Sequence, residues 1–246
     1  MVQDNDLVYK ILFVGLLPLG QASFLSGLNN TMHYPMHILP GIYGRADYSD
    51  MFGFTQKEVE ILLSKSTQNI KIDKLSSYYN GYKTSTGVCI YNPHSIMLSL
   101  KKGNVENYWA NSGSANTIRE CLKRCSRDIE IQLQNLFYTF YSLQDDDSLQ
   151  RLVEVELKPH LRYDVLEKKL EINAIYTLLC YSGYLTVKTY STDVEPNKEW
   201  GSTKVQLIIP NREVAEQWKQ WIIDFIGIGW LKTNNIFNSL FKKDIK

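Results

Sequence analysis

The chain has 246 residues, enough for one large domain or two small ones, and its formal net charge at pH 7 is only +1. This balance gives no general electrostatic attraction to nucleic acid or to an anionic membrane. The four cysteines are scattered in apolar or helical surroundings, and the chain lacks both a secretory signal and a run of about 18 apolar residues, so we expect a soluble intracellular protein, cytoplasmic or nuclear, that does not enter the membrane.

A buried strand is predicted near the start of the chain, where residues 7–16 form a short apolar run that ends near Gly15 and Pro18. A long loop rich in proline, glycine and histidine follows over residues 29–48. A buried strand needs neighbours on both sides, so we expect its partners in later sequence or in a segment that this chain lacks.

Helical patterns dominate the next part of the chain. The clearest helix covers residues 54–64, because Thr55 and Glu58 complete a capping box before an apolar stripe. A small hairpin is predicted around the turn at Asn80 and Gly81. Its second strand covers residues 88–91, and further helices are predicted over residues 72–79, 93–101 and 116–123. The pattern over residues 127–143 is less clear.

The C-terminal half has the most regular pattern. It predicts helices over residues 148–156 and 171–181, strands over 184–190 and 204–209, and a long helix over 211–226. Helix, helix, strand, loop and strand is the order of a winged helix-turn-helix. The candidate recognition helix offers almost no donor for reading bases beyond Asn173, which favours internal packing over DNA binding.

No motif of known chemistry is complete in the sequence. It contains no GxxxxGK[ST] phosphate loop, no GxGxxG after a strand and no HExxH. Cys121 and Cys125 have helical spacing but no further zinc ligands nearby, and His33 and His37 fall in the long loop. We therefore expect no catalytic residue and no metal site in this chain.

Six short blocks are more specific together than any one alone. They are FLSGLNN (24–30), FGFT (52–55), YNGY (79–82), YNPHS (91–95), YWANS (108–112) and IPN followed by Glu213 (209–213). In this order they resemble the AAA-ATPase-like family. Its members typically join an N-terminal P-loop ATPase domain to a C-terminal nuclease-like domain of the PD-(D/E)XK class.

The resemblance implies an α+β, mainly helical fold that corresponds to the middle of a longer architecture, lacking both the P-loop and the nuclease domain. Residues 1–50 would be the C-terminal edge of an ATPase-like α/β core, and residues 51–145 a helical lid-like region. Residues 146–230 would form a winged-helix-like domain, and residues 231–246 the start of a linker to the missing nuclease-like domain.

The same resemblance marks individual residues. Those expected closest to a nucleotide are Ser26, Asn29, Asn30 and Asn111. Those expected to serve structure are Gly27, Phe52, Gly53, Gly81, Tyr82, Asn92, Pro93, Trp109, Pro210, Asn211 and Glu213. Two departures count against nucleotide chemistry, because Val14 stands where the family often has threonine and Asn80 where it often has aspartate.

These observations predict a truncated or degenerate AAA-ATPase-like protein that is non-catalytic by itself and acts as an interaction module, through self-association or a protein partner. No cofactor is expected for the chain alone, although the family uses ATP and Mg. Two alternatives stay open. The chain could be part of an ATP-dependent nuclease-type enzyme whose P-loop lies on a missing segment, or a winged-helix module that binds DNA.

Overall fold

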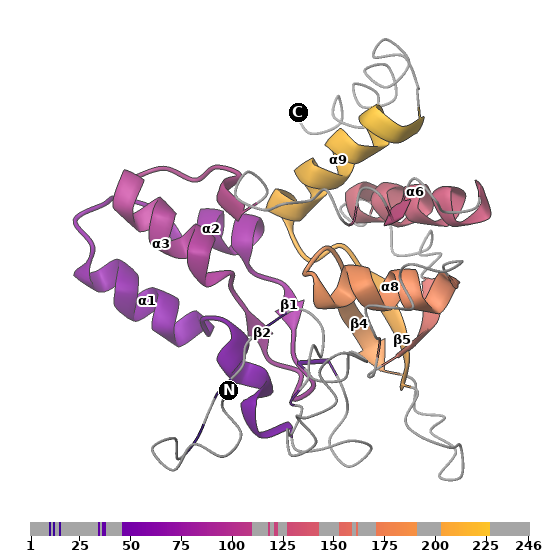
Figure 1. Cartoon of the computed structure of the whole chain (residues 1–246). Coiled ribbons are helices and arrows are strands. Elements are labelled where there is room, and N and C mark those ends of the chain that lie inside the picture. Colours follow the sequence, from indigo (N-terminus) through magenta and orange to yellow (C-terminus); the bar gives the residue numbers. More distant parts are fainter. Residues whose placement is uncertain are drawn as a thin grey trace.

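The computed structural model describes residues 46–109, 127–142, 153–158, 171–190 and 203–226, together with residues 10, 12, 15, 34, 36, 37, 118, 121, 122 and 161. Their helices and strands form an α+β fold (Figure 1). Buried apolar side chains gather in two cores, one within a helical unit and one around a three-stranded sheet. Within these residues, no helix is long and apolar enough to cross a membrane.

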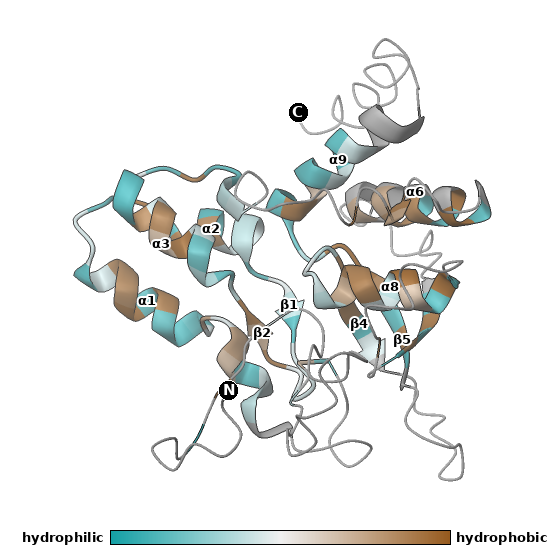
Figure 2. Cartoon of the chain, in the orientation of Figure 1, coloured by the Kyte–Doolittle hydropathy of each residue, from teal (hydrophilic) through white to brown (hydrophobic). Residues whose placement is uncertain are grey.

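The helical unit comprises the 3-10 helix η3 (Ala46–Phe52) and the helices α1 (Gln56–Lys65), α2 (Ile72–Tyr79) and α3 (Pro93–Lys102). The predicted capping box at the start of α1 is confirmed, since Thr55 and Glu58 bond reciprocally. The helices are amphipathic (Figure 2), and their apolar faces meet in one core. The buried members of that core are Val59, Leu75, Tyr79, Tyr91, Ile96, Val105 and Tyr108.

A short hairpin leads from the helical unit to the sheet. It pairs β1 (Tyr82–Lys83) with β2 (Cys89–Ile90) in antiparallel register. The side chains of Tyr82 and Ile90 belong to the core of the sheet unit, not to that of the helices. The Lys83 N–H also donates to Thr186 Oγ1 at 2.9 Å, which fixes the hairpin beside the sheet.

The sheet unit contains α6 (Arg127–Ser142), β3 (Val153–Leu157), α8 (Ile172–Tyr181), β4 (Thr186–Tyr190), β5 (Thr203–Ile208) and α9 (Arg212–Ile226). Its strands are antiparallel in the order β3-β5-β4. Helix α8 lies against the sheet, with α6 and α9 beyond it (Figure 1). The core of the sheet unit therefore contains residues of α6, which precedes position 145, together with residues of the later elements. It spans the expected boundary between the regions 51–145 and 146–230.

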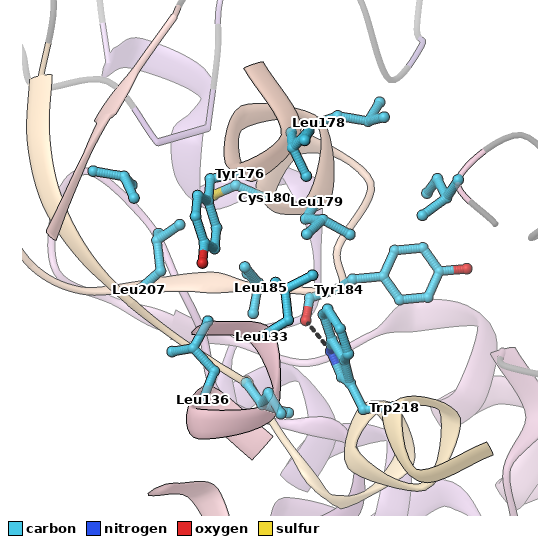
Figure 3. Close-up of a cluster of buried hydrophobic side chains, with 14 of the residues drawn as sticks. Leu133, Leu136, Tyr176, Leu178, Leu179, Cys180, Tyr184, Leu185, Leu207 and Trp218 are labelled. Atoms are coloured by element: carbon cyan, nitrogen blue, oxygen red, sulfur yellow. Dashed lines mark hydrogen bonds between the residues drawn. The ribbon is translucent and has the colours of Figure 1, made fainter. Parts of the chain in front are cut away.

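Helix α8 forms the centre of this core, because every residue from 174 to 180 is buried. Leu133 and Leu136 of α6 reach the same cluster, and so does Trp218 of α9 (Figure 3). The indole N–H of Trp218 donates to the Tyr184 carbonyl at 3.0 Å, so this large side chain is buried without losing its hydrogen bond.

The structure corrects one predicted helix. The sequence predicts a helix over residues 148–156, but Val153–Leu157 forms the strand β3, and residues 148–152 lie outside the described part of the chain. The sequence VEVEL alternates, so Val155 and Leu157 are buried while Glu154 is exposed, and this period of two suits a strand with one covered face. The less clear region that follows residue 126 is the helix α6.

The start of the chain also differs from the prediction. Lys10, Leu12 and Gly15 have no regular structure, and the Leu12 side chain is 85% exposed, so a buried strand is wrong at these positions. A buried strand needs hydrogen-bonded neighbours, and no strand in the described part of the chain pairs with these residues. The remaining residues of the range 7–16 lie outside the described part.

Candidate functional site

Most of the residues that the resemblance marks as structural meet where the helical unit joins the sheet unit. We call this cluster the joint. It consists of Asn80, Gly81, Tyr82, Asn92, Ser95, Trp109, Pro210, Asn211 and Glu213.

Glu213 is the centre of the joint. It lies in the first turn of α9, where acidic residues are favoured by the helix dipole, yet its side chain is 0% exposed. The Ser95 hydroxyl of α3 lies 3.0 and 2.8 Å from its two carboxylate oxygens, and the Trp109 backbone N–H donates to it at 2.7 Å. One carboxylate on α9 thus holds two separate segments of the helical unit.

Among the described residues, the groups that hydrogen-bond to Glu213 are uncharged. Burial raises the pKa of the Glu213 carboxyl, and the hydrogen bonds from Trp109 and Ser95 oppose that rise. Among the residues that the structure describes, no lysine, arginine or histidine forms an ion pair with it. The carboxylate is enclosed and its oxygens contact the Ser95 hydroxyl and the Trp109 N–H, so in this arrangement it is not open to a substrate.

Two asparagines of the joint are helix caps, and one of them, Asn211, also ties the two units together. Asn92 Oδ1 accepts from the His94 N–H at 3.0 Å and so begins α3. Asn211 Oδ1 accepts from the Val214 N–H at 3.1 Å and begins α9, while its Nδ2 donates to the Asn80 carbonyl at 3.0 Å.

Tyr82 lies between these groups. Burial raises the pKa of its phenol, the Glu213 charge raises it further, and hydrogen bonds with the side chains of Asn211 and Asn92 lower it. The polar atoms of the joint are therefore directed toward one another, with a buried phenol among them.

Two glycines marked by the resemblance permit close backbone contacts. Gly81 has a φ of +105°, and a Cβ at this position would lie 2.1 Å from the Pro210 carbonyl oxygen. At Gly53, a Cβ would lie 2.5 Å from the carbonyl oxygen of Tyr91. Both positions need a residue without a side chain.

Trp109 connects the joint to the sheet unit, whereas the other two marked residues, Pro93 and Phe52, lie outside the joint. The Trp109 ring lies 4.9 Å from the Tyr184 ring, which lies 4.4 Å from Trp221, so aromatic contacts run from the joint into the core of the sheet unit. Pro93 is the first residue of α3, as predicted. Phe52 is 47% exposed at the end of η3 and takes no part in the joint.

The candidates for a nucleotide site are Ser26, Asn29, Asn30 and Asn111, and all lie outside the described residues, as does Gly27. Their proximity to a nucleotide stays a prediction. Ser95, the hydroxyl partner of Glu213, was missed as a site residue. The signal was available, since it is the last residue of the YNPHS block.

A second polar cluster fixes the hairpin to η3. Asp50 Oδ1 accepts from the hydroxyls of Thr84 at 2.7 Å and Thr86 at 2.6 Å, and these bonds hold the pKa of the Asp50 carboxyl below its usual value. His37 Nδ1 lies 3.1 Å from the Lys83 carbonyl, and burial lowers the pKa of His37 to about 4. In the described ranges, no three His, Cys, Asp or Glu side chains gather as metal ligands would.

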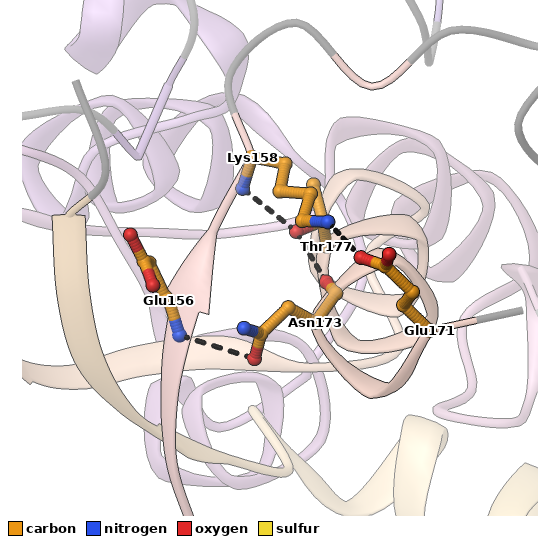
Figure 4. A network of polar contacts seen from close by, with 5 residues as sticks. All are labelled: Glu156, Lys158, Glu171, Asn173 and Thr177. Carbon is orange, nitrogen blue, oxygen red and sulfur yellow. Dashed lines mark hydrogen bonds and ion pairs between the residues drawn. The ribbon is translucent and has the colours of Figure 1, made fainter. Parts of the chain in front are cut away.

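The polar side chains of α8 cover the edge of the sheet (Figure 4). Asn173 Oδ1 accepts from the Glu156 N–H at 3.4 Å, and Thr177 Oγ1 accepts from the Lys158 N–H at 2.9 Å. These bonds satisfy main-chain donors along the outer edge of β3. The amide oxygen of Asn173, the one base-reading candidate in this helix, is therefore engaged inside the protein.

The fold and the joint define an α+β protein in which a helical unit is locked to a helix-covered antiparallel sheet. Over 123 residues, half of this chain, it is 26% identical to a protein of Azotobacter chroococcum mcd 1 described as "Uncharacterized protein in vnfD 5'region". The matched stretch covers 22% of that protein, so the similarity concerns about a fifth of a longer chain. No protein-family model and no solved structure matches.

Proposed function

We propose that this chain is a degenerate AAA-ATPase-like module that is non-catalytic by itself and acts by binding another protein chain. One observation supports this most strongly. Asn211 and Glu213 bond to segments of the helical unit, and Asn92 caps α3, so these three motif residues are used within the protein. These side chains therefore hold the two units in position, and the one acid among them, Glu213, is not directed at a substrate.

The sheet unit fits a winged-helix-like domain used for packing. A helix, a strand, the helix α8 and a two-stranded wing, with the sheet order β3-β5-β4, follow the winged-helix arrangement. A DNA-reading helix must expose donors to the groove, whereas α8 is buried from residue 174 to residue 180. This burial supports the packing role over the alternative of DNA binding.

The exposed apolar side chains of η3 are the surface that we assign to association. Met51 is 74% exposed, and Tyr48 and Phe52 are each about half exposed on the same short helix. Adjacent exposed apolar groups are costly to leave in water and are typical of protein contact surfaces. The free thiols of Cys89 and Cys180 support a reducing compartment, and we place the protein in the cytoplasm or nucleus.

Sedimentation velocity tests this assignment. We expect the protein to self-associate at concentrations up to about 100 μM, which corresponds to weak but specific affinity. The double variant Met51→Ser, Phe52→Ser should lose this association. The control Ile61→Ser removes a half-exposed apolar side chain from α1 and should retain the association. A strictly monomeric protein, or equal association in all variants, would contradict the proposal.

One alternative is that the chain forms part of an ATP-dependent nuclease-type enzyme. The match to about a fifth of a longer protein fits a chain that is one part of a larger architecture, but it carries no information about ATP or nuclease activity. ATP turnover above background by this chain, abolished by substituting Asn29 or Asn111, would favour that enzyme over the interaction module. A shift of duplex DNA at low salt that weakens as salt is added would instead support a winged-helix DNA-binding module.

A further inference from the structure

Glu213 carries a buried carboxyl whose charge is not compensated by any cation among the described residues. The side chain is 0% exposed, and its partners are the Ser95 hydroxyl and backbone N–H groups. A carboxylate that loses its hydration without gaining a cation is costly to keep ionised, even when it accepts good hydrogen bonds. A group of this kind, placed between two cores, makes their contact depend on its protonation.

In the part of the chain that the structure describes, the elements around the carboxyl supply no positive charge to it. From α2 and β1 it is faced by the phenols of Tyr79 and Tyr82, whose pKa values its charge helps to raise. The α3 neighbour is Ser95, and the segment before residue 110 contributes only N–H groups. On α9 itself, the Arg212 side chain is exposed and lies over the Tyr78 ring at 5.3 Å, and Glu216 is partly exposed.

We propose that Glu213 is a proton-dependent latch between the helical unit and the sheet unit, which tightens when the carboxyl takes up a proton and loosens when the proton leaves. A protonated carboxyl can still accept the Trp109 N–H. Its O–H can donate to Ser95 Oγ, which is both donor and acceptor. Proton uptake from solvent therefore removes the buried charge and keeps the hydrogen bonds of the joint.

The sign of the effect follows from the pKa of Glu213, which burial raises. The folded protein then holds this proton more tightly than the unfolded chain does. The contribution to stability is fully present below the pKa of the unfolded glutamate. It is lost as pH rises through the higher pKa of the folded state.

The amide proton of Trp109 reports directly on this carboxyl, because its N–H donates to it at 2.7 Å. In an NMR pH titration of the wild-type protein, we expect this resonance to shift in one transition with a midpoint above about 4.3, the value of an ordinary glutamate. A midpoint at or below that value, or a Trp109 resonance that does not titrate, overturns the proposal. This measurement needs no variant.

A second measurement compares Glu213→Gln with Glu216→Gln, a control on the same helix. Glutamine keeps an acceptor for the Trp109 N–H but cannot ionise. We expect the melting temperature of the wild type to fall by a few degrees across the Trp109 transition, and that of Glu216→Gln to fall equally. Glu213→Gln should show no such fall. An equal fall in all three proteins would assign the pH dependence to other groups and overturn the latch.

Discussion

Gly81 illustrates how one residue can set the distance between two units. Its backbone has a φ of +105°, and the Pro210 carbonyl occupies the place of a side chain. Gly87, in the turn of the hairpin, also has a positive φ, of +87°. A Cβ at Gly87 would meet no atom of the described residues within 4 Å. A substitution at Gly87 therefore tests backbone strain alone, whereas a substitution at Gly81 tests backbone strain together with a steric clash.

The comparison of these glycines gives a prediction for unfolding in urea. Gly87→Ala should cost about 1–2 kcal/mol, the strain of a left-handed residue with a Cβ. Gly81→Ala should cost clearly more, because the contact with Pro210 must also open. Equal costs for the two variants would show that the close approach at Pro210 contributes nothing.

At the scale of single residues, the sequence predicted which positions belong to the joint better than it predicted what each side chain contacts. The resemblance singled out Asn92, Asn211 and Glu213, and the capping roles of the asparagines follow from residue type. The partners of Glu213 could not be predicted, because Ser95 lies 118 residues earlier in the chain. A contact of that separation depends on how the two units pack.

At the scale of elements, local signals predicted the helices that begin with caps. Helix α1 carries a capping box and α3 begins with an asparagine followed by proline, and both form where expected. The strand β3 was missed because VEVEL is short and lies beside sequence that also suits a helix. Its pairing with β5, about 50 residues later, decides the outcome, as strand formation depends on tertiary context.

The hairpin formed by β1 and β2 should loosen in acid. Hydroxyl bonds from Thr84 and Thr86 lower the pKa of Asp50, so its contribution is present above the ordinary aspartate pKa of about 3.9 and lost as pH falls through the folded value. At neutral pH, Asp50→Ala should speed exchange of the Thr84 amide, which bonds to the Val88 carbonyl, by about fivefold, while Asp73→Ala should not. Unchanged exchange in Asp50→Ala would show that η3 does not support the hairpin.

At the scale of the whole molecule, two cores are joined by the hairpin and by the joint. Neither core was placed by sequence alone, because the hydrophobic pattern of each helix shows which face is buried but not against what. The side chains of Tyr82 and Ile90 cross from the helical unit into the sheet core. This crossing, together with Glu213, makes the two units depend on each other for stability.

The most direct test of this account is native-state hydrogen exchange of α3 and α8 amides at increasing urea, in the wild type and in Glu213→Ala, with Glu216→Ala as control. In the wild type and the control, we expect α3 and α8 to converge on one opening free energy. In Glu213→Ala, the opening free energy of α3 should fall by about 1–3 kcal/mol, because the buried Ser95 hydroxyl of α3 loses its carboxylate acceptor. Separate openings in the wild type, or an α3 that Glu213→Ala leaves unchanged, would contradict the claim that the motif residues lock the two units together.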